Sequence, residues 1–359
     1  MQKIILPILL IFVLSACSSE SDETTQNPMP SENLYFPSLE ENAVWETKSI
    51  ADLGWNQNAV NPLLTYLEEK HSKGFIILVD GKIVMENYFN GHSASTNWYW
   101  ASAGKTLTST MVGIAEQENY LNIYDKVSDY LGNGWTSEPL AKENLITNKH
   151  LLTMTSGLDD AINEDCVTPE CLVYKADAGT RWAYHNSYVK LQDVVAEATS
   201  QTYANYFNSK LRNKIGMNGA WIQSGNNSVY WSTTRSMARF GLLMLNKGKW
   251  NNDVILNENY FNGATNTSQN INLGYGYLWW LNGKASYHLP QSQLQFSGSI
   301  IPEAPNDMFM ALGKNDQKIY VVPSKKLVVI RMGEAADNVN LALSDFDEVL
   351  WDKINALIN

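Results

Sequence analysis

The stretch at residues 97–110, NWYWASAGKTLTST, decides between two kinds of fold and two kinds of chemistry. Its Gly-Lys-Thr resembles the end of a phosphate-binding loop, whereas Ser102 and Lys105 have the spacing of a serine nucleophile beside a lysine. A phosphate-binding loop requires a glycine five residues before Gly104, and the chain has Tyr99 there. The neighbouring tryptophans would also keep the backbone away from a phosphate, and no βαβ unit is predicted. We therefore reject the phosphate loop.

The Ser-Lys interpretation has a physical basis. Ser102 is predicted to begin a helix, whose N-terminus favours the negative charge of an alkoxide. A buried Lys105 on the same face can lose its proton and act as a base. Spacing alone is weak evidence, because about one or two S-x-x-K matches are expected by chance, and Ser187 with Lys190 is a second one. The companion pattern Y-x-N occurs at Tyr88, Tyr120, Tyr184, Tyr203, Tyr206 and Tyr260.

Strands are predicted at both ends of the domain and helices between them. Residues 75–89 read as two strands joined at Asp80-Gly81, a hairpin signal, and residues 308–333 read as three more strands with a hairpin around Pro323. Apolar residues at helical spacing predict helices near 57–71, from the nucleophile to about 118, and at 345–358. We expect one antiparallel sheet formed by the N- and C-terminal strands and flanked by helices, plus a central, mostly helical lobe.

Several longer stretches together resemble the serine β-lactamase-related hydrolases, which include class C β-lactamases, D-alanyl-D-alanine carboxypeptidases, esterases and 6-aminohexanoate-dimer hydrolases. The nucleophile segment 98–131, AGTRWAYHNSYVKL at 178–191 and the strands at 311–333 carry the resemblance, which covers about residues 70–335. It implies an α/β (α+β) fold of the β-lactamase/transpeptidase type. It also selects Tyr184 and Asn186 among the six Y-x-N matches.

The resemblance implies an acyl-enzyme mechanism without a cofactor. Ser102 would attack a carbonyl carbon, and Lys105 or Tyr184 would be the base, a choice that stays open. Asn186 would orient the substrate or Lys105, and the oxyanion would bind backbone N–H groups of Ser102 and of the closing strand at Gly313-Lys314.

The closing strand departs from the pattern of the β-lactamases. They carry [KH]-[TS]-G, whereas this chain has Ala311-Leu312-Gly313 followed by Lys314. The cationic or imidazole group and the hydroxyl that meet a β-lactam are therefore absent at these positions. ALGKNDQ looks more like the G-x-x-G-Q variant of the 6-aminohexanoate-dimer hydrolases, with Asp316 in place of the second glycine. A linear amide, a short peptide-like substrate or an ester is expected, and the rival hypothesis is a penicillin-binding-like or sensor module that acylates or binds without efficient turnover.

The N-terminus predicts export. The first 17 residues resemble a signal peptide with a lipobox: they contain Lys3, an apolar run at 4–14 and the sequence LSAC at 14–17. The apolar run is too short to span a bilayer. We predict a signal peptide at 1–16, a lipidated Cys17, a flexible Ser-, Glu- and Pro-rich tether at 17–44, and a hydrolase domain at 45–359. The alternative is an ordinary signal peptide cleaved near Ala16. The lipid would hold the protein at the bacterial cell envelope.

Composition excludes other classes of function. The net charge is −11 in 359 residues with no dense basic run, so nucleic-acid binding is not expected. Cys166 and Cys171 predict a short-loop disulfide in an oxidising compartment, and a metal site at two sulfurs without a nearby Cys or His cluster is the weaker alternative. The five histidines show no metal-binding spacing; His150 and His185 are expected to be structural.

Overall fold

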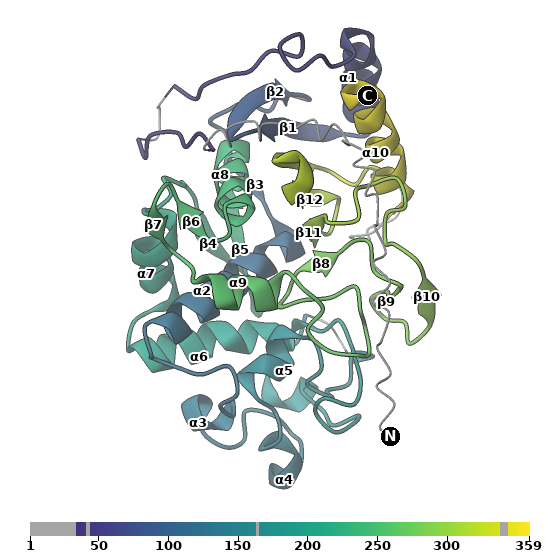
Figure 1. Ribbon diagram of the computed structural model, residues 1–359. Coiled ribbons are helices and arrows are strands. Elements are labelled where there is room, and N and C mark those ends of the chain that lie inside the picture. The colour runs from purple at the N-terminus through teal and green to yellow at the C-terminus, as the bar shows by residue number, and fades with distance from the viewer. Residues whose placement is uncertain (1–33, 41–43, 163–164, 338–343) are drawn as a thin grey trace, which may run out of the picture. The chain divides into compact units, whose positions relative to one another are not determined.

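A six-stranded antiparallel sheet, in the order β2-β1-β13-β12-β11-β8, organises the fold (Figure 1). The computed structural model describes residues 34–40, 44–162, 165–337 and 344–359. Residues Leu34–Asn359 form one compact unit. Cys17, the predicted signal peptide and most of the predicted tether lie outside the described residues.

The helices and strands follow one another along the chain in an order that places strands at both ends. The helical elements are η1 (Gln57–Ala59), α1 (Val60–Glu69), η2 (Ala101–Gly104), α2 (Lys105–Gln117), α3 (Ser128–Leu131), α4 (Leu140–Glu143), α5 (Asn148–Leu152), η3 (Pro169–Cys171), η4 (Asn186–Val189), α6 (Lys190–Thr199), α7 (Tyr203–Phe207), η5 (Asn208–Arg212), α8 (Thr234–Leu245), α9 (Glu258–Ala264), η6 (Pro323–Lys325) and α10 (Asp345–Ile358). The strands are β1 (Ser72–Val79), β2 (Lys82–Tyr88), β3 (Trp98–Tyr99), β4 (Ala220–Ser224), β5 (Asn227–Ser232), β6 (Lys249–Trp250), β7 (Asp253–Val254), β8 (Trp280–Leu281), β9 (Ser286–His288), β10 (Gln295–Ser297), β11 (Phe309–Gly313), β12 (Gln317–Val322) and β13 (Leu327–Gly333).

The sheet joins the two ends of the domain, as predicted. β1 pairs with β2 across the hairpin at Asp80 and Gly81, both of which have the positive φ that such a turn requires. On its other side β1 pairs antiparallel with β13, so that Ile76 faces Ile330 in register. The predicted fold class is therefore confirmed.

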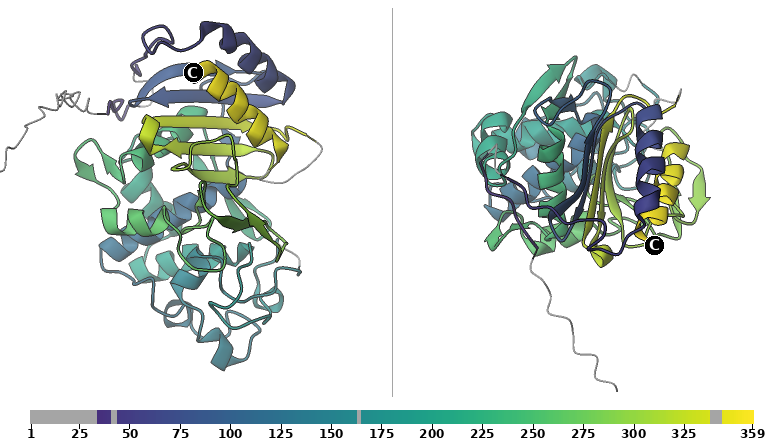
Figure 2. Two further views of the ribbon diagram at one scale, coloured as in Figure 1. Left: turned by 45° about the vertical axis from the view of Figure 1, so that its right-hand side comes forward. Right: turned by 90° about the horizontal axis from the view of Figure 1, so that it is seen from above.

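Helices cover both faces of this sheet. α1 and α10 lie side by side on one face, and α8 packs against β1, β12 and β13 on the other (Figure 2). Of the apolar residues that predicted the first and last helices, Leu63 and Leu350 are fully buried, whereas Val349 is exposed. Among the described residues, no helix combines the length and the apolar character that crossing a membrane requires.

Helix α2 is buried along most of its length. Every residue from its first, Lys105, to Ala115 is buried, and α2 contacts α6 and α9. A helix that is enclosed all round holds a side chain at its first turn in a fixed place. This arrangement positions Lys105.

The described end of the predicted tether contacts the domain. The backbone N–H of Tyr35 donates to the Asp80 carbonyl at 2.9 Å, and the Phe36 ring packs edge-on against Trp250 with ring centroids 5.0 Å apart. Residues 34–36 are thus part of the folded unit rather than free chain.

Glu138, before α4, is a buried carboxyl that should make stability depend on pH. Burial, and then the charges of Glu143 and Asp177, raise the pKa of Glu138 to about 7. The folded state therefore binds this proton more tightly than the unfolded state, so the stabilisation is complete at acid pH and is lost as pH rises through about 7. We expect Glu138→Gln to raise the free energy of unfolding at pH 8 by about 1–2 kcal/mol and to change it little near pH 4.5. Urea unfolding at both pH values measures this, and equal shifts at the two would contradict it.

Candidate active site

A strained turn presents Ser102. β3 ends at Tyr99, and the Trp100 backbone N–H donates to the Tyr230 carbonyl at 2.9 Å. Ala101 then has φ of 47°, a left-handed conformation that is uncommon for a residue with a side chain. Ser102 lies in the 3-10 turn η2, and α2 begins only at Lys105. The predicted helix start is thus three residues too early, because residues 101–104 form the tighter turn.

Lys105 is the centre of the site. Its Nζ lies 2.9 Å from Ser102 Oγ and 3.2 Å from Asn186 Oδ1, and donates to both oxygens. The residue is only 2% exposed. The amine that contacts the serine hydroxyl is therefore almost completely shielded from solvent.

Two tyrosine rings enclose the lysine amine. Nζ lies 4.9 Å from the centroid of the Tyr184 ring and 4.2 Å from that of Tyr188. Tyr184 also stacks on Trp280, with ring centroids 5.7 Å apart. Complete burial raises the pKa of Tyr188 far above its ordinary value, which keeps this phenol neutral. Sequence reasoning missed Tyr188, although it follows Tyr184 by four residues in the same motif.

The neighbouring His185 has a structural contact. Its Nδ1 accepts a hydrogen bond from the Ser187 backbone N–H at 3.0 Å and so caps η4. Burial lowers the pKa of His185; the charge of Asp160 opposes this shift, and the charge of Lys105 adds to it. The ring is therefore a neutral cap at neutral pH.

Strand β11 ends directly against the nucleophile turn. A Cβ atom on Gly313 would lie 2.5 Å from the Trp100 carbonyl oxygen and 2.9 Å from the Ala103 nitrogen. Only glycine permits so close an approach of two backbones. Lys314 follows with an exposed side chain, whereas Leu312 is buried. The structure thus brings the end of the closing strand next to Ser102.

Buried side chains hold the turn that follows Gly313. Asn315 and Asp316 both have positive φ, at 60° and 58°. Gln317 Nε2 donates to the Asn315 carbonyl at 2.8 Å, and Arg331, which is fully buried, donates to the Asn315 and Asp316 carbonyls at 2.9 and 3.1 Å. The same guanidinium donates to the carbonyl of Lys70, just before β1, at 2.7 Å. Long-range contacts therefore determine the shape of this turn.

We expect Gln317→Met to lower kcat by about tenfold with little change in KM, because the turn would lose one of the two side chains that hold it beside Ser102. The amide also donates to Gly333 at 2.6 Å, so some loss of stability should accompany the change. Gln192→Met is the matched control, since this buried amide donates to Thr108 Oγ1 at 3.1 Å, away from the turn. Ester hydrolysis and thermal unfolding of both variants measure the two effects. A similar loss of kcat in both would contradict the positioning role.

The remaining predicted residues lie outside this cluster. A disulfide joins Cys166 and Cys171. Lys190, of the second S-x-x-K match, pairs with Asp193 at 3.5 Å on the surface of α6. Within the described residues, no group of three or more His, Cys, Asp and Glu side chains is arranged to hold a metal ion. The tryptophans at positions 100, 182, 279 and 280 are buried, and Trp98 is half-buried.

Comparisons with known proteins find a matching family model and a shared fold. The family model described as beta-lactamase matches residues 66–342. No curated protein matches the chain. Among solved structures, a Bacillus anthracis protein provisionally described as a 6-aminohexanoate-dimer hydrolase has a TM-score of 0.67 at 18% identity, covering 90% of this chain and 89% of its own. A Mycobacterium bovis beta-lactamase has a TM-score of 0.60 at 17% identity over 83% and 98% of the two chains. EstCE1, a hydrolase with promiscuous acyltransferase activity, has a TM-score of 0.63 at 12% identity over 85% and 99%.

Proposed function

Because this chain belongs to the beta-lactamase family, we propose that it is a serine hydrolase that cleaves an amide or ester bond through an acyl-enzyme on Ser102. One observation carries the proposal: a buried lysine amine lies 2.9 Å from the Ser102 hydroxyl oxygen. That distance permits proton transfer between the two groups. Asn186, which accepts from the same amine at 3.2 Å, fixes its direction.

Acylation begins with proton transfer from Ser102. With Lys105 neutral, the Oγ–H donates to the Nζ lone pair, and Oγ attacks the carbonyl carbon of the substrate as Nζ takes the proton. The carbonyl π electrons move to oxygen. The backbone N–H groups of Ser102 and of Lys314, directly after the closing strand, receive this oxyanion, which the close approach of Gly313 to the nucleophile turn supports.

Collapse of the tetrahedral intermediate breaks the bond to the leaving group. The proton on Lys105 passes to the leaving amine or alcohol, with Tyr184 as the second candidate for the transfer because its ring lies against Nζ. Water then adds to the acyl-enzyme with the same groups acting as base. The products are a carboxylic acid and the free amine or alcohol, and Ser102 regains its proton.

A linear amide or an ester suits the site better than a β-lactam. Leu312 is buried and apolar where β-lactamases of this type carry a hydroxyl, and Ala311 stands where they carry a cation or imidazole. The preference rests on these two side chains, because the fold is shared both with a protein described as a 6-aminohexanoate-dimer hydrolase and with one described as a beta-lactamase.

A fluorophosphonate probe tests the reaction. We expect one probe per chain, and peptide mapping by mass spectrometry should locate it on Ser102 and not on Ser187, the serine of the second S-x-x-K match. Assays with p-nitrophenyl esters, nitrocefin, a D-Ala-D-Ala peptide and a 6-aminohexanoate dimer should show turnover of an ester or a linear amide. Failure to label Ser102 would reject the proposal, and rapid nitrocefin hydrolysis would reject the preference for linear substrates.

The altered closing strand favours one second candidate, a module that acylates without releasing product. Leu312 and Ala311 remove groups that β-lactamases place at this edge of the site. Stoichiometric labelling of Ser102 without steady-state turnover of any substrate would support that candidate over the hydrolase.

We also propose that the protein is exported and anchored to the bacterial cell envelope by a lipid on Cys17. The support is the sequence of residues 1–17, with its short apolar run followed by LSAC. Growth with an alkyne-labelled fatty acid should tag the mature protein, and Cys17→Ser should abolish the tag and release the protein from the membrane fraction. A tag that survives the substitution would reject the assignment.

A further inference from the structure

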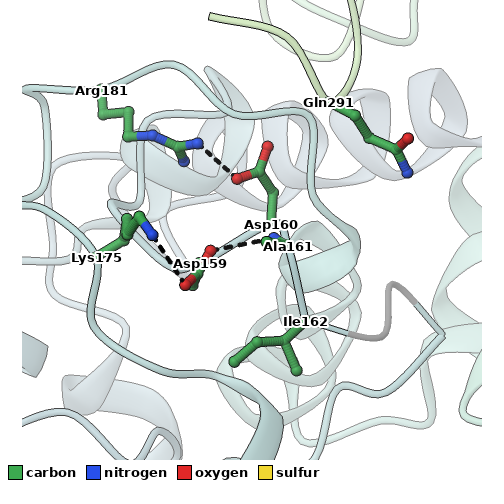
Figure 3. A pocket seen from close by; sticks show the side chains of 7 residues that line it. All are labelled: Asp159, Asp160, Ala161, Ile162, Lys175, Arg181 and Gln291. Atoms are coloured by element: carbon green, nitrogen blue, oxygen red, sulfur yellow. Dashed lines mark hydrogen bonds and ion pairs between the residues drawn. The ribbon is translucent and has the colours of Figure 1, made fainter.

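A second polar cavity lies beside the segment that carries Tyr184. Its volume is about 600 Å³, and its polar lining is Asp159, Asp160, Lys175, Arg181 and Gln291 (Figure 3). The mechanism proposed above uses none of these residues. Carboxylates, an ammonium, a guanidinium and an amide around one open cavity are suited to a polar, charged ligand.

Two ion pairs supply the charges. Arg181 Nη2 lies 2.6 Å from Asp160 Oδ1, and these side chains are 18% and 7% exposed. Lys175 Nζ lies 3.3 Å from Asp159 Oδ2, and the lysine side chain is 50% exposed (Figure 3). The arginine pair is thus close and shielded, whereas the lysine pair is long and accessible. A ligand can exchange with an exposed pair at little cost, because such a pair is worth only about 0–1 kcal/mol.

The backbone that carries the lysine pair is fixed before any ligand arrives. The Asp159 N–H donates to the Val173 carbonyl at 2.9 Å, and the Lys175 N–H donates to the Gly157 carbonyl at 3.0 Å. Asp159 Oδ1 also accepts from the Ala161 N–H at 3.1 Å. Asp159 therefore stays oriented if Lys175 moves away. Such pre-organisation lowers the entropy cost of binding.

The chain that lines the cavity continues into the segment that carries Tyr184. Arg181 precedes Tyr184 by three residues, and Gln293, from the loop that carries Gln291, donates to the Trp182 carbonyl at 3.0 Å. Charges in the cavity and in the candidate active site both act on the ring of His185. Burial lowers its pKa, the charge of Asp160 in the cavity lining raises it, and the charge of Lys105 in the candidate active site lowers it further. A substrate that reacts at Ser102 and extends past Tyr184 toward Arg181 would meet this cavity with its far end.

The balance of charges in the cavity indicates which kind of end group it can bind. The cavity holds two carboxylates and two cationic groups, so it is neutral as it stands. A ligand with one charge would displace one member of the lysine pair and leave it without a counter-charge, so it would gain one ion pair only by losing another. A ligand with both charges preserves neutrality: its ammonium replaces that of Lys175 on Asp159, and its carboxylate meets the released Lys175.

We propose that this cavity is a subsite for a zwitterionic end group, one that bears both a free ammonium and a free carboxylate. As a substrate subsite it rests on the proposed hydrolase function, and it narrows the substrate to an amino-acid conjugate whose zwitterionic end lies away from the cleaved bond. No bond changes in the subsite itself.

Three probes with one carbon skeleton test the charge rule by calorimetry on the wild-type protein: 5-aminopentanoate, pentanoate and pentylamine. None contains a bond that the enzyme could hydrolyse. We expect 5-aminopentanoate to bind at least tenfold more tightly than either single-charge analogue. Equal or tighter binding of an analogue, or no binding of the zwitterion at millimolar concentration, would overturn the proposal.

Variants locate the binding. Lys175→Met should weaken 5-aminopentanoate at least tenfold and shift the preference toward pentylamine, whereas Asp159→Asn should weaken it similarly and shift the preference toward pentanoate. Lys142→Met is the matched control, because Lys142 forms a comparable exposed pair with Asp177 outside the cavity lining. Unfolding temperatures identify any variant that fails to fold. Unchanged preferences in folded variants would overturn the assignment of the cavity.

The two proposals can fail separately. Fluorophosphonate labelling of Ser102 with turnover, but without selective zwitterion binding, would reject the subsite alone. Selective zwitterion binding without labelling would reject the hydrolase, and with it the role of the cavity as a substrate subsite.

Discussion

Lys105→Met is expected to lower kcat/KM for ester hydrolysis by about three to five orders of magnitude, as removal of a catalytic partner does in enzymes that activate a serine. Methionine has nearly the length of lysine without its amine, so Ser102 Oγ would lose the group 2.9 Å away that takes its proton. The surroundings of residue 105 should change little, since this position is nearly fully buried and two tyrosine rings lie against it. Some stability should also be lost, because Asn186 Oδ1 loses the donor that lies 3.2 Å away.

The chain supplies its own control for this experiment. Lys190→Met changes the lysine of the second S-x-x-K match, which is paired with Asp193 on a helix surface. It should leave turnover within about twofold of the wild type, as surface changes usually do. Rates of fluorophosphonate labelling and ester hydrolysis should be measured for both variants. Normal turnover in Lys105→Met would remove the proposed activation of Ser102.

Gly313→Ala is expected to lower kcat by about two to three orders of magnitude, the size of effect seen when an oxyanion donor is displaced. The added methyl group would lie 2.5 Å from the Trp100 carbonyl oxygen and 2.9 Å from the Ala103 nitrogen. Both are backbone atoms of the nucleophile turn, so β11 and η2 must move apart. The N–H groups proposed to bind the oxyanion would then no longer converge on one point.

Gly104→Ala separates this effect from a general sensitivity of the turn. Gly104 has φ of −65°, and a Cβ there would meet its nearest atoms at 3.8 and 4.0 Å, which is ordinary contact. We expect its kcat to stay within about fivefold of the wild type. Steady-state kinetics on one ester substrate, with circular dichroism to verify folding, measures both variants. Comparable losses of kcat in Gly104→Ala and Gly313→Ala would show that the close approach of Gly313 to the nucleophile turn does not explain the loss of activity.

Local patterns were sufficient to predict the framework of the fold. Asp80-Gly81 between two apolar runs identified the β1–β2 hairpin, and apolar spacing identified α1 and α10, because these signals depend on neighbours in sequence. The end of the predicted tether differed: Phe36 lies in a polar stretch, and its contact with Trp250 depends on a partner more than two hundred residues away.

In the candidate active site, too, some residues could be predicted from local sequence and others depend on the whole fold. Ser102 and Lys105 are neighbours on a turn and could be paired from spacing, whereas Asn186 could be joined to them only through a resemblance. Tyr188 and the charged cavity were not predicted, because which loops meet there depends on the whole fold. Arg331 is the clearest case: arginine usually lies at a surface, and nothing in its own strand shows that it is fully buried.

The contacts of Arg331 bear on when the protein can first act. Its guanidinium joins a carbonyl that precedes the first strand of the sheet to the turn beside Ser102, and Arg331 itself is among the last residues of the sheet to be synthesised. A growing chain that already contains Ser102 and Lys105 still lacks the hydrogen bonds of Arg331 to the turn and to Lys70. The emerging polypeptide is therefore expected to be inert toward bystander esters and amides until synthesis is nearly finished, so reactivity arises together with the completed fold.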